Sequence, residues 1–92
     1  MTMTKEEMRE WFEIEHLPQS LKTRKRKLIE QFEKNLPRSI EKYRQDFPNM
    51  SPEEVKAVLH IIFVGELPER LEEAEEELRG FFEEILKRHD KN

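Results

Sequence analysis

Residues 51–65 read SPEEVKAVLHIIFVG and contain the strongest local signal for structure in this 92-residue chain. Ser51 is a preferred helix N-cap, Pro52 suits the first helical position, and Glu54 completes a capping box. The sequence therefore predicts a helix from Pro52 to Val64. On a helical projection its apolar residues cover an arc of roughly 200°, so this helix needs cover on more than one side. We expect it to be the innermost helix of the fold.

A last helix is predicted downstream of that segment. Gly65 is well placed to close the preceding helix in left-handed geometry, and Pro68 suits the first turn of a helix that runs to about Arg88. Apolar residues follow Pro68 at alternating spacings of three and four, which is the pattern of a short heptad seam. The seam residues are Leu71, Ala74, Leu78, Phe81 and Ile85.

Two further helices are predicted upstream. Thr4 and Glu7 form a capping box for a short first helix, which Pro18 is expected to end. The second helix carries an apolar face that continues in phase past Pro37, so we expect a kink or a break there. The sequence thus predicts an all-α fold, an up-and-down bundle of about four helices in a single domain, residues 1–92.

The composition restricts the classes of function. Apolar residues make up 35% of the chain and charged residues 41%, so the core is expected to be small and the surface large. The absence of cysteine excludes disulfides, thiolate nucleophiles and sulfur ligands for metals. The longest apolar run, residues 58–64, is interrupted by His60 and is much shorter than the roughly 20 residues that span a bilayer. We therefore expect a cytoplasmic protein without membrane contact.

The sequence offers no convincing catalytic chemistry. Its serines stand where helix starts and turns favour them, and two glycines cannot build a phosphate-binding loop. One E-x-x-H step, from Glu13 to His16, has the spacing of carboxylate-bridged metal sites, but the second such step that those sites need is missing. No catalytic residue, metal site or cofactor is predicted, and the chain is not expected to be an enzyme.

Basic residues are concentrated in the second predicted helix. Between Pro18 and Arg44 there are nine basic and three acidic residues, in a protein whose net charge is −4. Five of the basic residues fall on one side of the helix, opposite its apolar face. This basic stripe consists of Arg24, Lys27, Lys34, Arg38 and Lys42. Such a stripe can contact phosphates or an acidic protein surface, or it can be a solvated helix face.

The C-terminal part of the chain has the opposite charge. Residues 51–92 contain twelve acidic and six basic residues. The candidate acidic face for partner binding consists of Glu72, Glu73, Glu76 and Glu77. Like charges at this spacing oppose helix formation, so a basic partner or the basic stripe of a second copy would stabilise them.

These features predict a non-enzymatic binding or regulatory protein that acts on a protein partner through charged helix faces and apolar surface. A homodimer is expected, because the wide apolar arc exceeds what short neighbouring helices can cover. Nucleic-acid binding through the basic stripe is the first alternative. A small structural subunit of a larger complex is the second.

Overall fold

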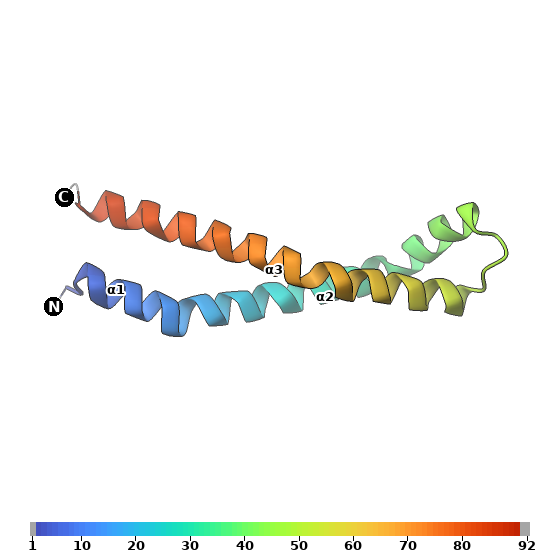
Figure 1. The fold of residues 1–92 in the computed structure, drawn as a ribbon, viewed down its shortest axis with the longest axis horizontal. Helices are drawn as coiled ribbons and strands as arrows, with labels where there is room; N and C mark the ends of the chain where they lie inside the picture. The colour runs from blue at the N-terminus through green and yellow to red at the C-terminus, as the bar shows by residue number, and fades with distance from the viewer. Residues whose placement is uncertain (1, 91–92) are drawn as a thin grey trace.

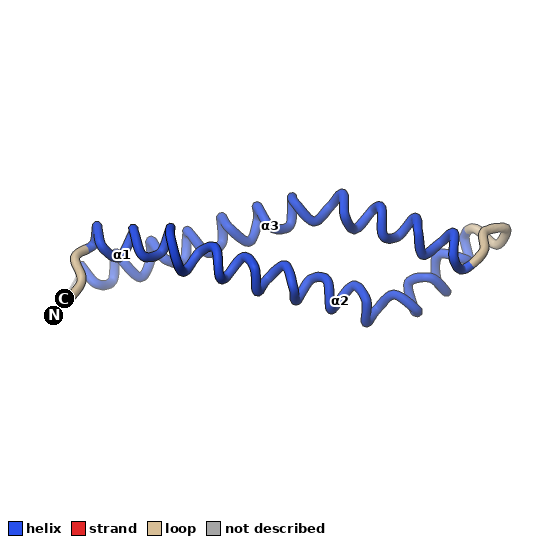
Figure 2. Tube along the Cα trace, turned by 90° about the horizontal axis from the view of Figure 1, so that it is seen from below, coloured by secondary structure: helices blue, strands red, loops and turns tan. Residues whose placement is uncertain are grey.

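The computed structural model describes residues 2–90 as a long helical hairpin (Figure 1). Its first arm consists of α1 (Lys5–Trp11), one π-helical turn η1 (Phe12–His16) and α2 (Leu17–Asp46). A short turn leads to the second arm, which is the single helix α3 (Pro52–Asp90). The arms run antiparallel, so both ends of the chain lie at one end of a molecule that measures 64 × 21 × 18 Å (Figures 1 and 2).

The prediction of an all-α chain is confirmed for the described residues, but the prediction of about four helices in a bundle is wrong. Two of the expected boundaries, at Pro18 and at the segment from Gly65 to Pro68, lie inside continuous helical arms. The chain therefore forms two long arms in place of four short helices. The predicted helix Pro52–Val64 is the first part of α3 and has no innermost position, because Ile61 and Val64 are exposed.

Pro18 does not end the first helix, because the backbone widens just before it. The N–H of Leu17 donates to the carbonyl of Phe12, five residues back, which is the hydrogen-bond pattern of a π-helix. In a regular α-helix the ring of a proline clashes with the carbonyl four residues earlier. The wider turn gives the ring of Pro18 room, and the helical arm continues.

Gly65 and Pro68 are likewise accommodated inside α3. Gly65 does not adopt a positive φ, so it does not act as a left-handed helix end. Pro68 cannot donate to the carbonyl of Val64, but both residues are exposed, which gives that carbonyl access to water. Phe63, which precedes this segment, is buried against the first arm and helps to hold α3 continuous.

Pro37 also lies within a continuous helix. α2 extends from Leu17 to Asp46 without interruption, and its last part bends away from the line of its first part (Figures 1 and 2). Loss of the hydrogen bond to the carbonyl of Glu33 accounts for a bend at this position. The bend brings the end of α2 toward the turn that leads into α3.

Packing between the arms forms one narrow apolar seam. Phe12 stacks on Phe82 with ring centroids 4.2 Å apart, and Phe32 stacks on Phe63 at 4.3 Å. The buried side chains of the described residues are Phe12, Leu17, Leu36, Val55, Phe63, Ala74 and Leu86. The core of the hairpin is thus a single line of side chains between two helices.

The seam on α3 differs from the predicted heptad seam in its last two turns. After Ala74 and Leu78, the side chains that pack against the first arm are Phe82 and Leu86. Their spacing of four is longer than the 3.6 residues of a helical turn, so the line of contact moves around α3. Phe81 and Ile85, the predicted seam residues, are left 67% and 44% exposed.

Candidate protein-binding groove

One broad face of the hairpin carries a continuous groove between the two arms. At the end where the chain begins and ends, an apolar pocket of ≈ 360 Å³ is lined by residues of both arms, among them Trp11, Phe81 and Ile85. It shares His16 and Leu78 with a middle pocket. The middle pocket in turn shares side chains with a third pocket nearer the turn. We call these three connected pockets the interhelical groove.

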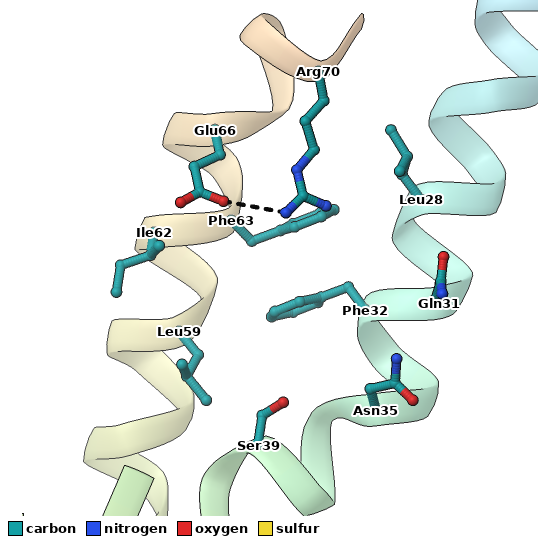
Figure 3. A pocket seen from close by; sticks show the side chains of 10 residues that line it. All are labelled: Leu28, Gln31, Phe32, Asn35, Ser39, Leu59, Ile62, Phe63, Glu66 and Arg70. Atoms are coloured by element: carbon teal, nitrogen blue, oxygen red, sulfur yellow. Dashed lines mark hydrogen bonds and ion pairs between the residues drawn. The ribbon is translucent and has the colours of Figure 1, made fainter. Parts of the chain in front are cut away.

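The part of the groove nearest the turn is shown in Figure 3. Its volume is ≈ 310 Å³, and the stacked rings of Phe32 and Phe63 form its floor. The ring of His60 meets Phe32 edge-on at 5.0 Å, and its Nδ1 lies 2.9 Å from the carbonyl oxygen of Lys56. His60 therefore packs and forms a hydrogen bond at the edge of the core. Arg70 and Glu66 form an ion pair at the rim of this pocket (Figure 3).

The end pocket owes its shape to the π-helical turn. Trp11 stacks on His16 with ring centroids 4.9 Å apart, and Phe12 packs deeper, on Phe82. One extra residue in a helix rotates the residues before it by about 100° relative to the residues after it. The π turn η1 therefore sets the direction in which Trp11 and Phe12 point. Trp11 remains 42% exposed at the mouth of the pocket.

The opposite face of the hairpin carries ion pairs between the arms. Arg79 of α3 forms a bidentate pair with Glu13 of η1, and Arg9 lies 3.7 Å from Glu83. Hydrogen bonds to Glu13 first and to Glu75 second raise the pKa of Arg79 above its ordinary value. Arg79 and the groove residue Phe81 point about 160° apart around α3. This face of the hairpin therefore carries two ion pairs between the arms, around a pocket of ≈ 320 Å³.

The structure brings part of the predicted basic stripe to the rim of the groove. Arg24 and Lys27 line its middle part, and Lys27 and Lys34 also line a shallow pocket beside it. Arg38 and Lys42 follow on α2 at helical spacing and are exposed. The positive edge is therefore confined to the middle part of the groove, because Arg38 and Lys42 line none of its three pockets.

The predicted acidic face is divided by the geometry of α3. Glu77 approaches Arg24 across the groove, with an Oε2 to Nη2 distance of 3.7 Å, and Glu73 lies one turn away on the same side. Glu72 and Glu76 are exposed, and they project from other sides of the helix. The structure thus brings one residue of the basic stripe and one residue of the acidic face into contact with each other.

Sequence reasoning missed the apolar part of this site. Phe81 and Ile85 were expected in the packed seam of the last helix, and Trp11 was not among the candidate site residues. No residue type or spacing indicates that these side chains line an open pocket. Their position depends on the π turn η1 and on the gradual shift of the contact line around α3. The one available signal was their abundance, since a 92-residue chain with a thin core has few places to bury them.

The described residues show no constellation for metal binding or for crossing a membrane. No group of three or more His, Asp or Glu side chains in residues 2–90 is arranged to hold a metal ion. Glu13, from the E-x-x-H step, is engaged by Arg79, while His16 stacks on Trp11. Within the same residues, no helix combines the length and the apolar content that a bilayer span requires.

Comparison of the chain with protein-family models, with curated proteins and with solved structures found no match. The functional conclusion therefore comes from the groove itself. It offers ring faces and aliphatic side chains along its floor, with charged groups at its edges. These groups suit the docking of an amphipathic helix.

Proposed function

We propose that this chain is a non-enzymatic binding or regulatory protein of the cytoplasm that holds a helical segment of a protein partner in the interhelical groove. The observation that carries the proposal is the open apolar end of that groove, where Trp11, Phe81 and Ile85 are all more than 40% exposed. Aromatic side chains grouped in a pocket are the usual anchors of protein interfaces.

The shape and the edges of the groove support a helix as the bound element. The groove follows the two arms, with apolar side chains at its two ends and Arg24 and Lys27 of the basic stripe in its middle part. Helix-in-groove recognition uses such a floor for affinity and charged edges for orientation. Polar side chains on the outer face of the partner helix would remain in water.

The proposal is tested by capture from an extract of the native host with the purified, immobilised chain. Ile85→Asp places a charge inside the end pocket and should abolish capture of the specific partner. Val64→Asp is the matched control, because Val64 is an exposed aliphatic residue of the same helix outside the groove. Equal capture by both variants and by the unmodified chain would show that the groove is not the binding site.

Nucleic-acid binding is a second candidate, favoured by the state of the basic stripe. Within residues 2–90, Arg24 is the stripe residue that has a carboxylate partner, and the other four are exposed without one. If the stripe contacts phosphates, affinity should fall steeply with salt for every duplex sequence tested. Each Lys or Arg replaced by Gln should flatten the slope of log affinity against log salt by nearly one unit.

A further inference from the structure

We propose that the occupant of the interhelical groove is a second copy of this chain, packed face to face so that α2 of each copy lies over α3 of the other. This inference rests on the proposed function, because it names the partner of the same groove. Three properties of the hairpin support it: its excess surface, its exposed apolar residues and the opposite charges of its two edges.

The hairpin exposes far more surface than a folded monomer of its size. Its accessible area is 7772 Å² for 11.3 kDa, whereas the scaling for folded monomers gives about 5,700 Å². The excess is about 2,000 Å² per chain. Obligate homodimers bury roughly 2,000 to 5,000 Å² in total, so covering one broad face of each hairpin would remove an excess of the right size.

The groove on this surface exposes apolar side chains at its two ends. The end pocket exposes large side chains of both arms, and Ile62 is exposed beside the stacked phenylalanines near the turn. On the opposite face, four of the six residues that line the pocket between the arms are charged, and they form the pairs of Arg79 with Glu13 and of Arg9 with Glu83. A second copy would therefore cover the face that carries the apolar end pocket and leave the charged face in water.

The charges select one of the two symmetric ways of packing two hairpins face to face. A two-fold axis along the hairpin places α2 over the α3 of the other copy, with both turns at the same end. A two-fold axis across the hairpin places α2 over α2, with the turns at opposite ends. The α2 edge of the groove is basic at Arg24 and Lys27, and the α3 edge is acidic at Glu73 and Glu77. The first arrangement sets opposite charges against each other, and the second sets basic against basic.

The heights of the charges, meaning their positions along the long axis of the hairpin, agree with the first arrangement. Arg24 and Glu77 lie at the same height, because they are 3.7 Å apart within one chain. An axis along the hairpin preserves heights, so Arg24 of one copy comes level with Glu77 of the other. Each charged edge therefore meets its complement without any shift along the arms.

The orientation is tested with a spin label, which the absence of cysteine makes specific. Asn49 lies exposed in the turn between the arms, so Asn49→Cys carries one label per chain. Turns at the same end should give an interlabel distance well below half of the 64 Å length of the hairpin. A distance near that full length would overturn the proposed orientation.

The charge complementarity is tested by sedimentation of charge-reversed variants. The double variant Arg24→Glu, Lys27→Glu makes both edges acidic, and Glu73→Lys, Glu77→Lys makes both basic, so each alone should lose the dimer. An equimolar mixture of the two should regain it. Lys22→Glu, Arg26→Glu is the matched control, because these exposed basic residues of α2 do not line the groove. Circular dichroism of each sample separates loss of folding from loss of association.

The outcomes distinguish this inference from the proposed function. An unmodified chain that stays monomeric up to about 100 μM overturns the second copy as occupant. If that monomer still captures a host protein in a manner sensitive to Ile85→Asp, the proposed function stands without this inference. A dimer that the charge reversals leave intact also overturns the α2-over-α3 packing.

Discussion

At the scale of single residues, the sequence predicted the two helix starts that have a capping side chain, at Thr4 and at Ser51. Ser51 accepts a hydrogen bond from the N–H of Glu54 at 3.2 Å, and the carboxylate of Glu54 accepts from the N–H of Ser51 at 3.4 Å. Thr4 accepts from the N–H of Glu7 at 3.1 Å. Both predicted caps are thus confirmed. Capping depends on side chains three residues apart, which is why it can be recognised without knowledge of the fold.

The cap of α3 can be tested directly. Ser51→Ala should lower the free energy of unfolding by about 1 kcal/mol, because the first turn loses a side-chain acceptor. The effect should reach the core, since Val55 is fully buried one turn later. Urea unfolding followed by circular dichroism measures the change. Ser51→Asp is the control, because an aspartate at this position restores the acceptor and should keep stability near that of the unmodified chain.

At the scale of helices, the sequence predicted the type of structure but not its continuity. Proline and glycine inside a helix have local costs of about 3 and 1 kcal/mol, and these costs argued for breaks at Pro18, Gly65 and Pro68. Packing between the two arms outweighs these local costs. Such packing cannot be recognised from a short window of sequence. The π turn η1 lacks a sequence signature altogether. The π turn η1 and the gradual shift of the contact line around α3 determine which side chains remain exposed. The prediction that Phe81 and Ile85 pack in the seam was therefore wrong.

The continuity of α3 predicts whether replacing Gly65 raises or lowers the free energy of unfolding. Gly65 is helical without positive φ, and a Cβ added there would meet no atom within 4 Å. Gly65→Ala should therefore raise the free energy of unfolding by roughly 0.5 to 1 kcal/mol. A helix that ended at Gly65 in left-handed geometry would instead be destabilised by this change. Gly80→Ala, equally open and also inside α3, should stabilise in either case and serves as the control.

At the scale of the whole molecule, the sequence located the charges of the candidate site but not their arrangement. A helical projection groups Arg24 with Lys27, and Glu73 with Glu77, around their own helices. The contact between Arg24 and Glu77 depends on how the two arms are aligned over their full length, which the turn and the stacked phenylalanines determine. The groove arises only from that alignment, so it was beyond the reach of patterns within one helix.

A second copy in the groove predicts different outcomes for two exposed residues of α3. Phe81 is 67% exposed inside the groove, and Ile61 is 72% exposed outside it. In a monomer, replacing either by Ser should change stability by no more than about 0.5 kcal/mol. In the proposed dimer, Phe81 is an anchor whose loss should weaken association at least about tenfold, whereas Ile61→Ser should have no such effect.

Thermal unfolding at several protein concentrations measures this difference. The melting temperature of a dimer rises with concentration, because association stabilises the folded state by mass action. The unmodified chain and Ile61→Ser should show the same rise, and Phe81→Ser should melt lower at every concentration within the range where the unmodified dimer persists. If the melting temperature of the unmodified chain is independent of concentration, the groove is not covered by a second copy. The exposed rings of Trp11 and Phe81 would then face either water or a different protein, and capture from the host extract decides between these two states.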